Sequence, residues 1–130
     1  MKMNKILTVD DSETDQFYVK AIINSYDPDI QIIQAYDGRE ALNILRDHQD
    51  QKPDLILLDI NMPGMNGHEF LKEYHQLVDQ KSPVIVILTS SSEEKDIEQT
   101  KMYSNVVEYL TKPIRHETLN AIQQKYTLGI

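Results

Sequence analysis

Three short runs of this chain are apolar on both of the faces that an extended strand presents, and they restrict the fold more than any other feature. The runs are residues 6–9 (ILTV), 55–58 (LILL) and 84–88 (VIVIL). A strand with one face in water alternates apolar and polar residues, whereas a strand of a parallel sheet that is covered on both sides does not. The runs therefore predict the central strands of a covered parallel sheet.

Weaker strand signals and helix signals lie around these runs. Two further strands are expected at Gln31–Tyr36 and Val106–Leu110. Ser12 followed by Asp15, and Asp37 followed by Glu40, have the spacing of capping boxes that begin helices. The later helices are expected at about Gly67–Asp79, at about Ser92–Tyr103, and after Pro113 as far as Tyr126.

The order of these elements predicts the architecture. Five strands that alternate with five helices through short connections form a parallel sheet with helices on both faces. Right-handed crossovers leave few arrangements of the strands, and the flavodoxin-like order 2-1-3-4-5 is the commonest for a small sheet. We therefore expect an α/β, doubly wound fold. A chain of 130 residues has room for one such domain, residues 1–130.

Polar residues follow the strands at the point where each one ends. These strand ends are Asp10-Asp11, Asp59, Thr89-Ser90 and Thr111-Lys112-Pro113. In a doubly wound sheet the carboxyl ends form one edge, where ligands bind. Three carboxylates at one edge are stable only with a cation among them, and ligands that offer only oxygen favour a hard ion such as Mg2+. The alternative, that each acid only caps a helix or ends a strand, stays open for Asp10 alone but is much weaker for the whole set.

The same residues, in this order and spacing, resemble those of a response regulator receiver domain, the phosphoacceptor module of two-component signalling. Asp10-Asp11 matches the acidic pair of that family, and LLDINMPGMNG (residues 57–67) matches the segment around its phosphorylated aspartate. Thr89-Ser90 matches its hydroxyl and small residue, and Tyr109–Pro113 matches its aromatic, lysine and proline. The resemblance covers the whole chain. Because no output domain is expected beside the receiver, the chain is similar to single-domain receivers, of which the chemotaxis regulator is the best-known type.

The resemblance implies a metal site and a phosphorylation site that share a residue. Asp59 would be the nucleophile that accepts the phosphoryl group. Asp11, Asp59 and the backbone carbonyl of Asn61 would bind Mg2+ directly, and Asp10 would bind it through water.

Further residues would bind the phosphoryl group or respond to it. Lys112 would place its charge on the phosphoryl oxygens and would be catalytic together with Asp59, while Thr89 and Ser90 would line the same site. Thr89 and Tyr109 would form a switch. As Thr89 moves toward the phosphoryl group, the Tyr109 ring would turn from an exposed to a buried rotamer.

The resemblance also implies partners and two features of the backbone. A histidine kinase or phosphotransfer protein would donate the phosphoryl group. A downstream target would bind the face made by the fourth helix, the fifth strand and the fifth helix, so the chain is a signalling phosphoacceptor rather than an enzyme. A cis peptide bond before Pro113 would direct Lys112 toward the site. Asn105 stands where the family commonly has glycine, and asparagine is the next-best residue for a left-handed helix stop.

The composition argues against other classes of protein. A net charge of −8 and a sequence pI near 4.8 disfavour a nucleic-acid-binding surface, which needs clustered basic residues. There is no cysteine for a disulfide or a thiolate metal site. No run approaches the roughly 18 apolar residues of a membrane span, and no signal peptide is evident, so a cytoplasmic protein without a membrane partner is expected. The histidines lack ligand spacing and are expected at the surface or rim: His48, His68, His75 and His116.

Three rival functions fit the sequence less well than a receiver does. A phosphatase of the haloacid dehalogenase type also uses an aspartate nucleophile and Mg2+, but it needs Asp-x-Asp after its first strand, and Asp10-Asp11-Ser12 lacks that spacing. A flavodoxin-like electron carrier would need a glycine-rich phosphate loop where residues 8–15 (TVDDSETD) carry four acids. A pseudo-receiver that only binds proteins would not need all of the reactive positions that are present here.

Overall fold

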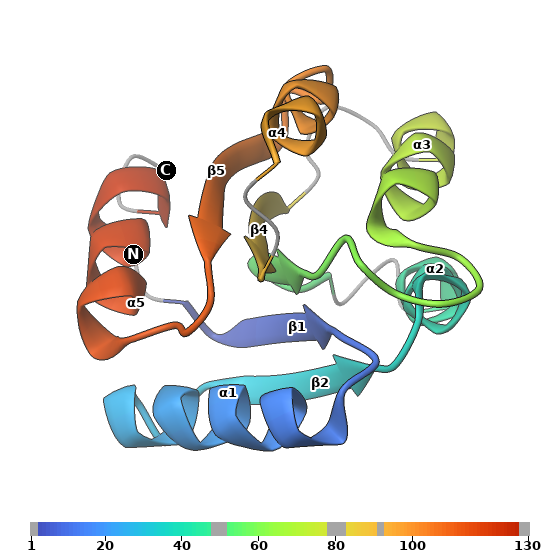
Figure 1. Cartoon of the computed structure of the whole chain (residues 1–130). Coiled ribbons are helices and arrows are strands. Elements are labelled where there is room, and N and C mark those ends of the chain that lie inside the picture. Colours follow the sequence, from blue (N-terminus) through green and yellow to red (C-terminus); the bar gives the residue numbers. More distant parts are fainter. Residues whose placement is uncertain (1–2, 48–51, 78–82, 91–92, 128–130) are drawn as a thin grey trace.

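The apolar runs form the middle of one parallel sheet, as the sequence predicts. The computed structural model describes residues 3–47, 52–77, 83–90 and 93–127. Its strands are β1 (Lys5–Val9), β2 (Gln31–Ala35), β3 (Leu55–Leu58), β4 (Val84–Thr89) and β5 (Val106–Thr111). They are ordered β2-β1-β3-β4-β5, and every neighbouring pair is parallel (Figure 1). The predicted fold class and strand order are confirmed.

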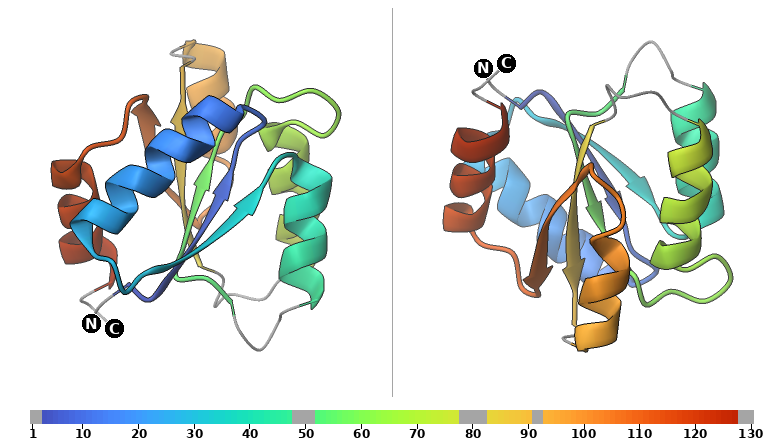
Figure 2. Two further views of the ribbon diagram at one scale, coloured as in Figure 1. Left: turned by 90° about the horizontal axis from the view of Figure 1, so that it is seen from below. Right: turned by 90° about the horizontal axis from the view of Figure 1, so that it is seen from above.

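Helices cover both faces of this sheet. They are α1 (Glu13–Tyr26), α2 (Gly38–Asp47), α3 (Gly67–Leu77), α4 (Glu94–Thr100) and α5 (His116–Ile122), which continues as the π-helical segment η2 (Gln123–Thr127). Helices α1 and α5 lie on one face, and α2, α3 and α4 lie on the other (Figure 2). Within the described residues, no helix combines the length and apolar character needed to cross a bilayer.

The fourth helix is shorter than the sequence predicts. Its expected start, Ser92, and the expected end of the third helix, Asp79, lie outside the described residues. Helix α4 ends at Thr100 rather than Tyr103, because the chain turns there: the Tyr103 N–H donates to the Thr100 carbonyl at 3.2 Å.

The prediction of a left-handed conformation at Asn105 is wrong. No non-glycine residue among those described has a positive φ. The connection into β5 is instead a hydrogen-bonded turn, in which the Val106 N–H donates to the Tyr103 carbonyl at 3.0 Å. The Asn105 carbonyl accepts from Ile85 N–H at 2.7 Å, so this residue already lengthens the ladder between β4 and β5.

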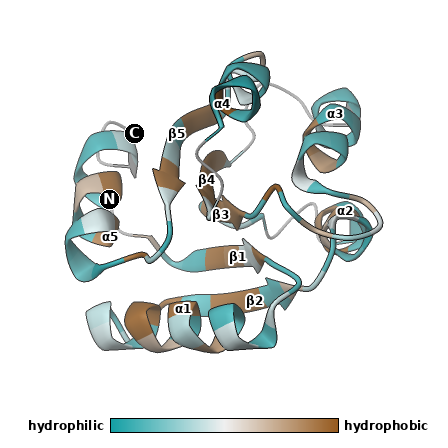
Figure 3. Cartoon of the chain, viewed as in Figure 1, coloured by the Kyte–Doolittle hydropathy of each residue, from teal (hydrophilic) through white to brown (hydrophobic). Residues whose placement is uncertain are grey.

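Two apolar cores explain why the central strands are apolar at every position. In β3, Ile56 and Leu58 pack on the α2 and α3 side, whereas Leu55 and Leu57 pack on the α1 and α5 side. In Figure 3 brown, hydrophobic ribbon accordingly prevails in β3, β4 and β5, whereas α2, α3 and α4 are largely teal and hydrophilic. Because an apolar core packs on each face of the sheet, the central strands are held in place from both faces up to their ends.

One polar side chain, Gln16, lies on the buried stripe of α1. Gln16 is 1% exposed, and it shares that stripe with Val19 and Ile23. Its Nε2 donates to the carbonyls of Ala35 at 2.9 Å and Asp10 at 3.1 Å, and its Oε1 accepts from the Thr8 hydroxyl at 2.6 Å. The amide therefore fastens the first turn of α1 to the ends of β1 and β2. Gln16 was not among the residues predicted from the sequence.

We predict that Gln16→Leu destabilises the fold at nearly constant volume. A leucine cannot replace the hydrogen bonds, and the Thr8 hydroxyl and the backbone carbonyls of Thr8, Asp10 and Ala35 would lose a partner. The expected loss is about 2–3 kcal/mol of the free energy of unfolding, measured by urea denaturation. Gln76→Leu, at an exposed position of α3, is the control and should change stability by less than about 0.5 kcal/mol. Equal effects of the two substitutions would contradict the assigned role.

Candidate functional site

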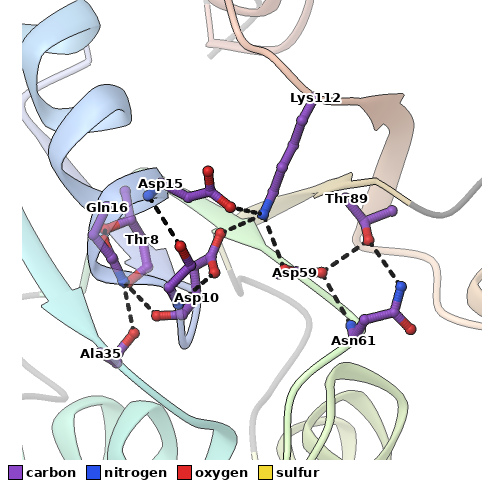
Figure 4. A network of polar contacts seen from close by, with 10 residues as sticks. Thr8, Asp10, Asp15, Gln16, Ala35, Asp59, Asn61, Thr89 and Lys112 are labelled. Atoms are coloured by element: carbon purple, nitrogen blue, oxygen red, sulfur yellow. Dashed lines mark hydrogen bonds and ion pairs between the residues drawn. The ribbon is translucent and has the colours of Figure 1, made fainter.

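Four side chains from four strand ends meet at the carboxyl edge of the sheet (Figure 4). Asp10 follows β1, Asp59 follows β3, Thr89 is the last residue of β4, and Lys112 follows β5. The parallel register explains the meeting, because Val9 is paired with Leu58 and Thr89 is paired with Thr111. The edge is therefore built by regular strands rather than by loop conformation.

The Lys112 ammonium group lies at the centre of this edge. Its Nζ is 2.7 Å from Asp10 Oδ2, 2.7 Å from Asp15 Oδ2 and 3.1 Å from Asp59 Oδ2. The lysine side chain is 18% exposed, so these contacts are only partly screened by water. The Lys112–Pro113 peptide bond is cis, and the Lys112 N–H donates to the Thr89 carbonyl at 2.9 Å.

The Asp59 carboxylate is buried and held through both of its oxygens. Its Oδ1 accepts from the Thr89 hydroxyl at 2.8 Å and from the Asn61 backbone N–H at 3.0 Å. Its Oδ2 accepts from Lys112 at 3.1 Å. Asp59 is 5% exposed, and its own backbone N–H donates to the Val9 carbonyl at 2.9 Å. Three donors thus fix the orientation of one carboxylate beside a hydroxyl and an ammonium group.

The loop after Asp59 owes its path to two glycines. Gly64 has φ +71°, a conformation that other residues rarely adopt. At Gly67 a β carbon would lie 2.5 Å from the Ile60 Cα, so only glycine fits there. The Gly67 N–H donates to the Ile60 carbonyl at 3.2 Å and closes the loop. The closed loop keeps the Asn61 backbone N–H within hydrogen-bond distance of the Asp59 carboxylate.

Three of the carboxylates form a cluster that fits a divalent cation. Asp10, Asp11 and Asp59 each offer an oxygen, and these atoms all lie within 4.8 Å of one another. Asp10 and Asp59 are buried, whereas Asp11 is exposed and leaves the cluster open to solvent. Oxygen-only ligands of this kind suit Mg2+ or Mn2+. The ligand role of the Asn61 carbonyl stays a prediction.

Burial and charge shift the pKa values of two groups at this edge. Burial raises the pKa of Asp10, and the nearby Asp59 charge acts in the same direction, while hydrogen bonds from Lys112 and the Ser12 N–H only partly offset this effect. Burial alone would lower the pKa of Lys112, but the hydrogen bonds to Asp10 and Asp15 and the charge of Asp59 raise it above its ordinary value. The lysine therefore stays protonated, and the acids still carry more charge than it can neutralise.

Comparison with known proteins identifies the family. The model of the response regulator receiver domain matches residues 6–124, nearly the whole chain. This chain belongs to the response regulator receiver domain family. The resemblance described from the sequence is thereby confirmed.

Relatives of similar length support the assignment. Protein PilH of Pseudomonas aeruginosa is 32% identical over 117 residues, which are 90% of this chain and 92% of PilH. A two-component response regulator from Cytophaga hutchinsonii has a TM-score of 0.87 at 28% identity, covering 96% of this chain and 97% of that one. Other relatives are longer: this receiver chain spans only 31% of a Vibrio vulnificus protein-glutamate methylesterase/protein-glutamine glutaminase 2, with 37% identity over 116 residues.

Two similar structures were solved with a ligand or a modification. The Mn2+-bound form of response regulator Rcp1 has a TM-score of 0.78 at 30% identity, covering 98% of this chain and 96% of that one. The phosphorylated cyanobacterial phytochrome response regulator RcpA has a TM-score of 0.78 at 27% identity, covering 99% of this chain and 97% of that one.

The remaining predicted residues of the receiver lie near this edge but outside its central contacts. Ser90 is exposed and directly follows Thr89. Tyr109 is paired with Ile87, two residues before Thr89, and its partly buried ring packs on the core shared with α2 and α3. The switch role of Thr89 and Tyr109 stays a prediction.

Asp15 corrects the sequence analysis, which assigned it to a capping box. Half of the box is present, because the Asp15 N–H donates to the Ser12 hydroxyl at 3.2 Å. The Asp15 carboxylate does not return to Ser12, whose N–H donates to Asp10 Oδ1 at 2.9 Å. The carboxylate instead contacts Lys112, 97 residues along the chain. No local spacing could signal so distant a partner.

The expectation for the histidines is also partly wrong. His68 of α3 is largely buried, with 17% of its side chain exposed, and its Nε2 lies 3.0 Å from Asp96 Oδ1 of α4. His75 is exposed and His116 lies at the surface beside the Ser25 hydroxyl, 2.6 Å away, as expected. His48 lies outside the described residues.

We predict that Asp10→Asn stabilises the metal-free receiver at neutral pH by about 1 kcal/mol in the free energy of unfolding. A carboxyl group whose pKa is raised by folding binds its proton more tightly in the folded state, so its ionisation costs stability as pH rises. An amide carries no such cost, and its single oxygen can still accept from Lys112; the hydrogen bond from the Ser12 N–H is lost, which limits the gain. The gain should shrink when the pH falls below the pKa of the folded carboxyl group.

The measurement is urea denaturation in EDTA over a range of pH. Asp11→Asn is the control, since it removes a carboxylate from the same cluster at an exposed position. If the cluster binds Mg2+, each variant should gain less stability from added Mg2+ than the parent protein does. A metal-free Asp10→Asn protein that is less stable than the parent would contradict the assigned electrostatics.

Proposed function

We propose that this receiver domain is a phosphoacceptor of two-component signalling, and that Asp59 is the phosphorylated residue. The observation that carries the proposal is the arrangement around Asp59. Its carboxylate lies 2.8 Å from the Thr89 hydroxyl and 3.1 Å from the Lys112 ammonium group, inside an acidic cluster that fits a divalent cation. A relative solved in a phosphorylated form supports it.

In the proposed reaction an Asp59 oxygen attacks the phosphorus atom of a phosphohistidine. A bond forms between that oxygen and phosphorus, the P–N bond breaks, and the imidazole nitrogen leaves with the electron pair. Lys112 and Thr89 would donate hydrogen bonds to the phosphoryl oxygens, with Ser90 beside them. Because the strand ends already hold these donors beside Asp59, their backbone positions would not have to change when charge moves onto those oxygens.

Mg2+ is the proposed cofactor, bound by Asp11, Asp59 and the Asn61 carbonyl, with Asp10 acting through water. A Mn2+-bound relative and the oxygen-only cluster support this assignment. When bound, the ion would neutralise charge on the phosphoryl oxygens. The chain's own contribution is to hold the three carboxylate oxygens within 4.8 Å of one another.

The proposed partners follow from this chemistry. The phosphoryl donor would be a histidine kinase or a phosphotransfer protein, which would place the receiver in the cytoplasm. The product is a modified receiver rather than a released small molecule, so the chain would act in signalling and not as an enzyme. The proposed target-binding face consists of α4, β5 and α5, which lie side by side in Figure 1.

Phosphorylation is tested by intact mass. With acetyl phosphate or phosphoramidate and Mg2+, the receiver should gain the mass of one phosphoryl group. Asp59→Asn should gain none, and omission of Mg2+ should slow the reaction by at least about tenfold. An Asp59→Asn protein that is modified as readily as the parent would show that another residue accepts the group. A parent protein that is never modified would favour the pseudo-receiver.

A second prediction tests the proposed switch. Thr89→Ala should still be phosphorylated on Asp59, because Lys112 and the metal cluster remain. Phosphorylation of this variant should, however, cause a smaller conformational change in α4, β5 and α5, because the Thr89 hydroxyl that contacts Asp59 is gone. Backbone chemical shifts of residues 93–126 measure the change, and Thr89→Ser should restore it. Full-size shifts in Thr89→Ala, phosphorylated to the same extent as the parent, would refute the coupling.

A further inference from the structure

Asp15 is the one carboxylate on Lys112 that the proposed phosphoacceptor chemistry does not use. It comes from the first turn of α1, and its Oδ2 lies 2.7 Å from Lys112 Nζ, as close as that of Asp10. It does not belong to the cluster of Asp10, Asp11 and Asp59. Figure 4 shows it approaching the ammonium group from the side of α1, away from Asp59 and Thr89.

The three contacts of Lys112 use its full donor capacity. An ammonium group has three N–H donors. Among the described residues, its three carboxylate partners are Asp10, Asp15 and Asp59. A phosphoryl oxygen that is to accept from Lys112 must therefore take a donor from one of these carboxylates or share it.

The three carboxylates differ in how easily they can release the lysine. The Asp10 and Asp59 side chains are only 10% and 6% exposed, so water cannot readily replace the lysine at their Oδ2 atoms. The Asp15 side chain is 42% exposed, so its carboxylate can turn into water. Loss of a hydrogen bond is cheap only where water replaces it.

We propose that Asp15 is a positioning residue that holds Lys112 in the resting site and competes with the phosphoryl group for its ammonium. Asp15 thus slows the phosphorylation of Asp59. The inference rests on the proposed function. It assigns to Asp15 no contact with the metal ion or with the reacting atoms.

Charge acts in the same direction as the competition for donors. A phosphoryl donor is an anion, and Asp15 adds a fourth carboxylate to an edge that already holds Asp10, Asp11 and Asp59. The repulsion falls with salt, because the Asp15 side chain is well exposed. A purely structural role in α1 would have no such salt dependence.

The test compares rates of phosphorylation by acetyl phosphate and Mg2+ at low ionic strength. Asp15→Asn should react about threefold to fivefold faster than the parent, as expected for loss of one exposed ion pair. At roughly 0.5 M salt the difference should fall below about twofold. Asp15→Glu keeps the charge and should keep the slow rate. Glu13→Gln removes a charge from the same turn but not from Lys112, and should leave the rate within about twofold of the parent.

Mg2+ affinity, measured by titration of the unphosphorylated variants, separates a positioning residue from a ligand. Asp15→Asn should change the dissociation constant by less than about threefold, whereas Asp11→Asn should weaken binding by at least about tenfold. An Asp15→Asn protein that reacts at the parent rate or more slowly overturns the inference, as does one that loses Mg2+ binding. If the parent itself is never phosphorylated, the proposed function fails and the inference fails with it.

Discussion

Asp10 and Asp59 lose almost all of their contact with water at the carboxyl edge of the sheet, and the Lys112 ammonium group is what allows both to remain there as neighbours. Two buried carboxylates at this distance repel each other, and each one also loses its hydration. One ammonium group offsets part of that cost but leaves an excess of negative charge, because Asp11 and Asp15 lie at the same edge. The lysine therefore offsets part of the repulsion at this edge, and the remaining negative charge is what the proposed Mg2+ would offset.

The backbone beyond the strand ends gives this edge its rigidity. The N–H groups of Asp10, Asp59 and Lys112 donate to the carbonyls of Ala35, Val9 and Thr89 at 3.1, 2.9 and 2.9 Å. Each functional residue is thus attached to the next strand by one further hydrogen bond. Gln16 secures α1 to the same edge from within the core. A site built on such regular elements keeps its geometry better than one built on loops.

Much of this edge could be predicted from the sequence, because strands impose strong patterns. The continuous apolar runs determined where β1, β3 and β4 end, and the residues that follow them had to meet. Contacts between side chains of distant helices leave no such pattern. Asp15 fitted a local capping rule equally well, and only the fold shows that its carboxylate reaches Lys112. The same holds for His68, whose partner Asp96 lies on another helix.

Gln16 is a different case, because a signal existed in the sequence. It stands three residues before Val19 and seven before Ile23, both buried, so it falls on the apolar stripe of α1. A polar residue in such a stripe must find hydrogen-bond partners, and the ends of β1 and β2 are the nearest ones. The polar residue in this apolar stripe therefore indicates a buried polar anchor next to the site.

The proposed target-binding face includes two weakly buried elements, α4 and β5. Only Thr100 is buried among the residues of α4, and Val106 to Leu110 of β5 are all half-buried. Such elements rearrange at low cost. The single O–H of Thr89 already donates to Asp59, so a hydrogen bond to a phosphoryl group would replace that contact. Its net contribution would be at most about 1 kcal/mol, a shift of at most roughly fivefold in population. A reversal from 1:99 to 99:1 would need about 5.5 kcal/mol. Phosphorylation alone would therefore bias this face only partly, and binding of the target would have to supply the rest. Because coupling between two sites is reciprocal, a target that prefers the switched face would in turn stabilise the phosphorylated receiver.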